Sequence, residues 1–124
     1  AGSKFGIEVH FKARGMRGER FSTEVETALY RVVQEAMANV VRHARASRAD
    51  VLLQLRDDRV MVMVEDNGVG FEPEQVRRRG DHVGLLGLEE RAEALGGTLT
   101  VESAPGAGAT IVVEVPIADP HPDR

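Results

Sequence analysis

The chain has 124 residues and a formal net charge of −4, with 42% hydrophobic and 29% charged residues, which suits one compact domain with its own core. The acidic balance argues against nucleic acid as a partner, because a nucleic-acid-binding domain usually presents a basic face. Cysteine is absent and no apolar run approaches the ~20 residues of a membrane span, so disulfides and thiolate metal sites are excluded and we expect a cytoplasmic domain without direct membrane contact.

The two ends of the chain predict the domain boundaries. Residues 1–3, AGS, are typical of the scar left by an expression tag. Pro116 closes the last apolar segment, and the residues after it are mostly polar. We therefore expect one domain over residues 4–117 and a tail over residues 118–124.

A strand, a loop and a long helix are the first predicted elements. Residues 5–11 alternate apolar and polar side chains, as a strand with one buried face does. Residues 12–20 are polar and contain glycines, which predicts a loop. Ser22 or Thr23 can cap the helix that follows, which we expect to end at about Ala44.

A hairpin is predicted next. Residues 50–56 alternate like a strand, and residues 60–65, VMVMVE, are apolar on both sides. Because only a short turn at 57–58 separates them, they should pair, with 60–65 central in the sheet. From residue 66 to 81 the pattern breaks, and glycines and charges predict an irregular segment.

The last elements are a helix and two strands. Residues 85–95 carry one apolar helical face that glycines 96–97 terminate. Residues 98–102 and 109–115 are predicted strands around a glycine-rich turn. The whole order predicts an α/β (α+β) two-layer sandwich, in which a mixed five-stranded sheet has helices on one face and a partly open opposite face.

A polar stripe lies on the long helix. At 100° per residue, Glu35, Asn39 and Arg42 fall within about 60° of one another. A solvated polar face is the simpler interpretation. The alternative is a ligand site, with an amide oxygen for a metal, a carboxylate for its water and a guanidinium for phosphate.

Asp66 stands where the apolar strand 60–65 ends. Asn67-Gly68 after it is typical of a hairpin turn, but Phe71 and the charged residues that follow cannot be the returning strand. A carboxylate here can accept a hydrogen bond from a ligand amine, such as that of adenine. Gly68 and Gly70 would let backbone approach a flat base closely.

Two glycines, Gly84 and Gly87, precede the second predicted helix. They are either a flexible entry to that helix or a phosphate contact at its N-terminus. The segment lacks the GxxxxGK[ST] pattern, so it is not a P-loop.

Other residues are interpreted as structural or solvent-exposed. Methionines 37, 61 and 63 are assigned to core packing. Three arginines at 77–79 are a surface cluster rather than a phosphate clamp. Histidines 10, 82 and 121 are expected to lie in solvent without a role in the site.

Four segments in order resemble the ATP-binding catalytic domain of bacterial sensor histidine kinases, in the GHKL superfamily with gyrase, Hsp90 and MutL. They are QEAMANVVRHARA at 34–46, DNGVGF at 66–71, GLLGLEER at 84–91 and LGGTLTVESAPGAG at 95–108. The resemblance covers residues 25–116 and is greatest to the nitrate-sensor branch. It implies a Bergerat fold that binds ATP and Mg²⁺.

The resemblance also implies roles on the long helix. Asn39 is similar to the Mg²⁺ ligand of the family, and Glu35 to the residue that engages the water shell of the metal. Arg42 and His43 are similar to nucleotide contacts. Mg²⁺ keeps several waters and bridges phosphate oxygens, which suits a site with one protein ligand.

The adenine side is implied at the end of the strand 60–65. Asp66 is similar to the family's adenine acceptor, with Gly68 and Gly70 shaping the floor of the site. The family often places a threonine directly after PGxG, where this chain has Ala109. Thr110, one residue later, takes that role only if a bulge turns it.

The resemblance implies that residues 71–83 form a lid over the bound ATP. Gly84, Leu85 and Gly87 resemble its hinge. The arginines at 77–79 would then lie near the triphosphate.

These expectations describe a kinase domain that donates the γ-phosphate of Mg-ATP to a histidine on a separate dimerisation domain, from which a response regulator takes it. The full-length protein is expected to be a homodimer. An anti-sigma serine kinase of the same superfamily and a noncatalytic docking module are the alternatives. The assignment requires Asn39 and Asp66 to open onto one cavity.

Overall fold

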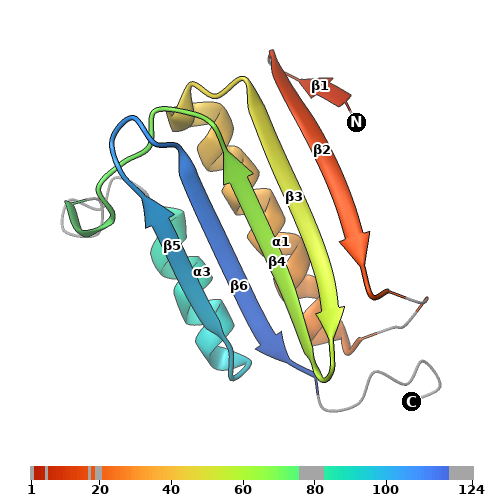
Figure 1. The fold of residues 1–124 in the computed structure, drawn as a ribbon. Coiled ribbons are helices and arrows are strands. Elements are labelled where there is room, and N and C mark those ends of the chain that lie inside the picture. Colours follow the sequence, from red (N-terminus) through yellow and green to blue (C-terminus); the bar gives the residue numbers. More distant parts are fainter. Residues whose placement is uncertain (1, 5, 17, 19–20, 76–82, 118–124) are drawn as a thin grey trace.

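Two layers make up the described part of the chain, a sheet and the helices behind it (Figure 1). The computed structural model describes residues 2–4, 6–16, 18, 21–75 and 83–117. No described helix is long and apolar enough to cross a bilayer. In chain order the elements are β1 (Gly2–Lys4), β2 (Ile7–Arg14), α1 (Thr23–Asn39), the π-helix η1 (Val40–Ala44), β3 (Arg48–Arg56), β4 (Arg59–Asp66), α3 (Val83–Ala94), β5 (Thr98–Ser103) and β6 (Ala109–Pro116).

The sheet has six strands in the order β1-β2-β3-β4-β6-β5. β2 and β3 are parallel, and the other neighbours are antiparallel. The predicted mixed sheet, its helices on one face and the central place of β4 are confirmed. All of the predicted strands are present, and the structure adds β1, which pairs Gly2 with Val9 and includes residues of the predicted tag scar.

The first predicted strand lies further along the chain than expected. The prediction was 5–11, whereas β2 extends from Ile7 to Arg14, through residues predicted to be a loop. Lys12 pairs with Leu52 in the parallel ladder with β3. That ladder satisfies backbone groups that a polar local sequence would leave to water, so tertiary pairing overrides local preference here.

The core lies between α1, α3 and the helix-facing side of the sheet. Val32 of α1, Val60 of β4 and Val115 of β6 are almost fully buried, with exposed fractions of 1%, 0% and 0%. Buried residues alternate along β4 and β6, as expected for strands with one covered face. Leu88 and Ala92 bring α3 onto the same cluster.

The methionines divide between the two faces of the sheet. Met37 packs against the core clusters, as predicted. Met61 and Met63 alternate with buried valines along β4 and therefore point to the helix-free face, where they are partly exposed. Their assignment to the core was wrong, because a strand apolar on both sides does not reveal which side the helices cover.

α1 begins where its capping residues predict. The Oγ atom of Ser22 accepts a hydrogen bond of 3.2 Å from the amide of Val25. The carboxylate of Glu26 reaches back to the amide of Phe21 at 3.1 Å. The first contact satisfies an amide that the first helical turn leaves unpaired, and the second holds the residue that precedes the cap.

Replacing Ser22 with alanine is expected to lower the free energy of unfolding by ~1 kcal/mol, because the amide of Val25 loses its partner. Urea denaturation of the purified chain measures this loss. Thr23→Ala is the control, since Thr23 is the first residue of the helix and not its cap. Equal losses in the two variants would contradict the capping role.

The end of α1 differs from the prediction. The α-helix stops at Asn39, and Val40–Ala44 form a π-helix before Arg45 adopts a left-handed conformation with a φ of 52°. Apolar residues continue across this junction, so the sequence pattern did not reveal the wider turn. Single π-helical turns occur frequently at functional sites.

Candidate functional site

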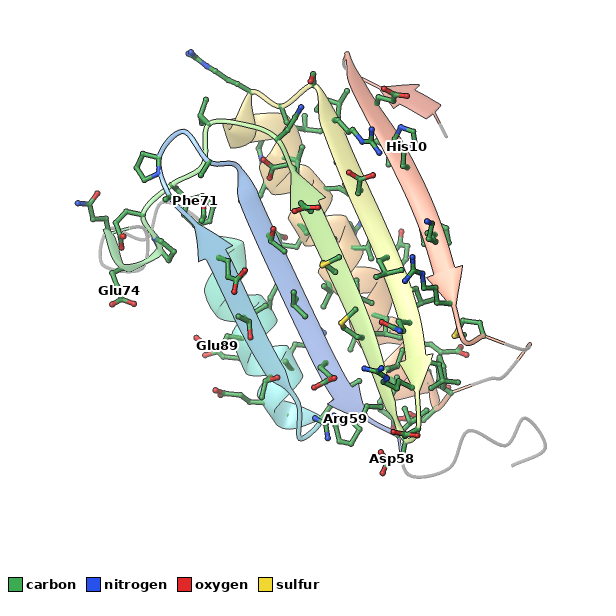
Figure 2. All side chains as sticks on the ribbon, viewed as in Figure 1. His10, Asp58, Arg59, Phe71, Glu74 and Glu89 are labelled. Atoms are coloured by element: carbon green, nitrogen blue, oxygen red, sulfur yellow. The ribbon has the colours of Figure 1, made fainter. Side chains whose placement is uncertain are left out.

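The predicted motif segments meet at one end of the sheet. The end of α1 with η1, the end of β4, the start of α3 and the β5–β6 turn all lie there (Figure 1). Phe71 marks this end of the molecule, while Asp58 and Arg59 mark the opposite one (Figure 2). Asp66 pairs with Ala49 in β3, and β3 follows η1 along the chain, so the hairpin brings Asp66 back beside the exit of the long helix.

The carboxylate of Asp66 is partly buried at the end of β4. Burial raises the pKa of Asp66, because it disfavours the charged form. Hydrogen bonds from the amides of Gly68, at 2.8 Å, and Ala109 act in the opposite direction on this pKa. A carboxylate has about four acceptor positions, so Asp66 keeps capacity for a ligand donor.

The loop after Asp66 packs tightly against the β5–β6 turn. Gly70 has a φ of 70°, and a Cβ atom there would collide with the carbonyl oxygens of Ala104 and Gly108. The hydroxyl of Ser103 accepts from the amide of Phe71 at 2.8 Å and donates to the carbonyl of Gly108 at 2.7 Å. The missing side chain of Gly70 therefore serves contact between two chain segments, while its predicted contact with a base stays a prediction.

An ion pair connects two residues of the polar stripe on the long helix. The guanidinium Nη2 of Arg42 lies 3.6 Å from Oε2 of Glu35, and both side chains are partly exposed. Arg42 lies in η1 and Asn39 ends α1. The structure therefore brings Glu35 and Arg42 together across the helical junction, with Asn39 between them in sequence.

Asn39 has a buried amide nitrogen without a hydrogen-bond partner among the described residues. An unsatisfied buried amide is costly. A ligand would remove that cost, and a 180° rotation of the carboxamide presents its oxygen, which is a ligand that Mg²⁺ accepts. Within the described ranges no group of three or more His, Asp or Glu side chains could hold a metal.

The second glycine motif lies inside a helix. α3 begins at Val83, so Gly84 and Gly87 occupy its first turns and do not precede it. Glycine costs about 1 kcal/mol in a helix interior, but Leu88 and Ala92 bury against the core and favour the helix. Gly87 is exposed, and the hinge role of Gly84, Leu85 and Gly87 stays a prediction.

Some predicted residues fall outside the described part of the chain. Residues 76–82, which include the arginine cluster and most of the predicted lid, are not described. The side chain of His43 is likewise outside the description, although its backbone belongs to η1. The predicted nucleotide contact of His43 and the predicted lid remain untested.

Thr110 is not brought together with the other predicted residues. It pairs with Glu65 in an uninterrupted ladder, and its hydroxyl lies 3.5 Å from Oε2 of Glu65. Asp66 pairs with Ala109 on the helix-facing side. No bulge turns Thr110, so strand alternation points it to the helix-free face, and the amide of Ala109 is the group beside Asp66.

A cavity of about 450 Å³ lies beside α1 where it faces β2, lined by Ile7, Val9, Gln34, Met37, Ala38, Val41 and Arg42. It does not include Asn39 or Asp66. The cavity predicted between these two residues stays a prediction, because part of its expected boundary, 76–82, is not described.

Sequence reasoning missed Asn67 and Ser103. Asn67 was treated only as half of a turn dipeptide, but its side chain hydrogen-bonds to Ser47 and Arg48. Ser103 links the end of the Asp66 loop to the β5–β6 turn. The polar residue types were visible in the sequence, but the partners of Asn67 lie 19 or more residues away, and Phe71, whose amide donates to Ser103, lies 32 residues from it.

Known proteins are similar to this chain in sequence. Residues 24–119 match the family described as histidine kinase-, DNA gyrase B-, and HSP90-like ATPase. The chain is 41% identical over 112 residues to the signal transduction histidine-protein kinase/phosphatase DegS of Brevibacillus brevis, covering 90% of this chain and 28% of that protein. It is 38% identical over 120 residues to the oxygen sensor histidine kinase NreB of Staphylococcus carnosus (strain TM300), covering 93% and 33%. The chain thus spans about a third or less of the length of these relatives.

A solved structure has the same fold. The histidine kinase domain of the Erythrobacter litoralis EL346 blue-light activated histidine kinase matches with a TM-score of 0.72 at 22% identity, covering 91% of this chain and 52% of that one. Likeness at this identity concerns the fold alone. The predicted fold class and the resemblance drawn from the motifs are both confirmed.

Proposed function

This chain belongs to the family of histidine kinase-, DNA gyrase B- and HSP90-like ATPases, and from that premise we propose that it is the ATP-binding catalytic domain of a sensor histidine kinase. In this role it binds Mg-ATP in the cytoplasm and donates the γ-phosphoryl group to a histidine on a separate helical dimerisation domain. A response regulator then receives the phosphoryl group, and the full-length protein is a homodimer.

The environment of the Asp66 carboxylate is the observation that supports this proposal. A carboxylate that is partly buried, with a raised pKa and spare acceptor capacity, is suited to an uncharged donor such as the exocyclic amine of adenine. The amides of Gly68 and Ala109 hold it in place, so it is positioned before the ligand arrives. Pre-positioned groups bind with less entropic cost.

Asn39 and Arg42 supply the phosphate side of the proposed site. The carboxamide of Asn39 would contact Mg²⁺, which neutralises phosphate charge when it is bound. The guanidinium of Arg42 lies 3.6 Å from the carboxylate of Glu35, and both side chains are partly exposed. This ion pair is therefore weak. A phosphate can compete for the guanidinium, which leaves the carboxylate of Glu35 free to hold water.

The isolated chain is expected to bind Mg-ATP and to form little phosphohistidine. None of its four histidines lies in a motif typical of a phosphoacceptor helix. The measurement is acid-labile label on the chain after incubation with γ-labelled ATP, alongside calorimetric binding of the nucleotide. Adding the dimerisation domain of the parent protein should restore labelling, on that domain.

Three outcomes would contradict the proposal in different ways. Stoichiometric phosphohistidine on the chain alone would place the acceptor within it. Label on a serine of a protein partner would favour the anti-sigma kinase. Absence of any nucleotide binding would favour the noncatalytic docking module.

A further inference from the structure

The side chain of Asn67 joins two segments that the proposed site needs. Its Oδ1 atom accepts from the amides of Ser47 and Arg48, each at 3.0 Å, and its Nδ2 atom donates to Oγ of Ser47 at 2.9 Å. The backbone amide of Asn67 donates to the carbonyl of Arg48 at 3.3 Å. Four hydrogen bonds therefore connect the residue after Asp66 to the turn that leads out of η1.

The backbone of Asn67 does not explain why an asparagine is present. An Asn-Gly hairpin turn of type I′ needs a positive φ at its asparagine. Among the described residues other than glycine, only Arg45 and Asp57 have a positive φ. The role of Asn67 therefore lies in its carboxamide, which offers both an acceptor and a donor to the same turn.

The two segments differ in how firmly they are otherwise held. Asp66 is fixed by ladder pairs with Ala49 on one side and Ala109 on the other. The exit of η1 has a left-handed residue at Arg45, and its short connection to β3 is otherwise held by a backbone hydrogen bond, in which the amide of Glu8 donates to the carbonyl of Ser47 at 2.9 Å. Loss of the Asn67 side chain should therefore displace the helix exit more than it displaces Asp66.

We propose that Asn67 is a positioning residue, which sets the distance between the metal-binding end of α1 and the adenine-binding carboxylate of Asp66. This inference rests on the proposed function. Asn67 contacts neither metal nor base in it and acts through the turn at Ser47 and Arg48. Its effect should appear in the part of nucleotide affinity that depends on Mg²⁺.

The test compares Asn67→Ala, Asn67→Asp and Ser103→Ala with the wild-type chain. Aspartate keeps two acceptors for the amides and can accept from the hydroxyl of Ser47, so it should rescue the alanine variant. Ser103→Ala removes two hydrogen bonds on the other side of the Asp66 loop, against three in Asn67→Ala, without touching the helix exit. Calorimetry gives the Kd of ADP in Mg²⁺ and in EDTA. The readout is the Mg²⁺-dependent ratio, which is the Kd in EDTA divided by the Kd in Mg²⁺.

A second readout uses no ligand. Amide exchange measured by NMR should show protected amides at Ser47 and Arg48 in wild type and faster exchange at both in Asn67→Ala. Protection should return in Asn67→Asp. A thermal melt of each variant identifies any global loss of stability, which would lower protection throughout the chain and not at these two amides alone.

The Mg²⁺-dependent ratio is expected to fall ~5-fold or more in Asn67→Ala, within the range of coupling for residues in one hydrogen-bond network. It should stay near the wild-type value in Asn67→Asp and in Ser103→Ala. An unchanged ratio in Asn67→Ala, or equal falls in Asn67→Ala and Ser103→Ala, would overturn the inference. If wild type itself shows no nucleotide binding, the proposed function has failed; if wild type binds with a Mg²⁺ effect and the ratio of Asn67→Ala is unchanged, only the positioning role has failed.

Discussion

Asp66→Ala is expected to weaken ADP binding by at least about 30-fold, which is ~2 kcal/mol, because a hydrogen bond to a charged, partly buried acceptor is lost. The structure gives the reason for choosing this carboxylate. Asp66 ends β4 on the helix-facing side and is held by the amides of Gly68 and Ala109. Calorimetry with Mg-ADP at neutral pH measures the change.

Glu65→Ala is the matched control for this loss. Glu65 is the neighbouring acid in the same strand, and it is exposed on the opposite face, where its carboxylate lies near Thr110. Its removal changes the net charge of the chain by the same amount as Asp66→Ala. A similar loss of affinity in both variants would show that charge, and not the position of Asp66, determines binding.

The raised pKa of Asp66 gives the same site a pH dependence. Folding favours the protonated form of this carboxyl group, so its contribution to stability is present below the pKa of the unfolded chain and is lost as the pH rises through the pKa of the folded chain. At neutral pH the charged carboxylate is therefore unfavourable for folding. Nucleotide affinity should respond in the opposite sense, falling as acidification protonates the acceptor.

Asp66→Asn separates these two effects. An amide is uncharged and can still accept from the amide of Gly68, so this variant should unfold at a higher denaturant concentration than wild type at neutral pH. The difference should shrink as the pH is lowered. Urea denaturation across the acidic range measures it, and a variant less stable than wild type at neutral pH would contradict the role assigned to burial.

Local patterns predicted the elements whose causes are local. The alternation in residues 50–56 and the apolar run in residues 60–65 correspond to β3 and β4, and Ser22 marks the start of α1. The motifs also indicated the correct family. In each of these cases neighbouring residues carry the signal, as a periodicity, a cap or a short sequence pattern.

The remaining features depend on partners far away in the chain. The polar residues of β2 form a strand because β3 lies beside them. Met61 faces outward because the helices cover the valine side of β4. Thr110 is separated from Asp66 by strand alternation, because the ladder between β4 and β6 continues there without a bulge. Residue spacing within the sequence does not predict which strands pair or which face of the sheet the helices cover.

Asn39→Ala is expected to abolish the dependence of ADP affinity on Mg²⁺ while leaving the chain at least as stable as wild type. The amide nitrogen of Asn39 is buried without a partner among the described residues, so truncation removes an unsatisfied group and substitutes a better helix former. If the Asn39 side chain stabilised the fold, its truncation would lower the free energy of unfolding instead. The expected result is a fall of ~10-fold or more in Mg²⁺-dependent affinity, with a free energy of unfolding that is unchanged or higher by up to ~1 kcal/mol.

Gln34→Ala is the control for the carboxamide on the same helix. Gln34 is exposed, so its truncation should change neither the Mg²⁺ effect nor the stability by much. Calorimetry in Mg²⁺ and in EDTA, together with urea denaturation, distinguishes the variants. A strongly destabilised Asn39→Ala would mean that the amide has a structural partner, whereas a stable variant that keeps its Mg²⁺ response would remove Asn39 from the metal site. A stable variant without that response is expected, because natural binding sites often retain groups that reduce the stability of the free protein.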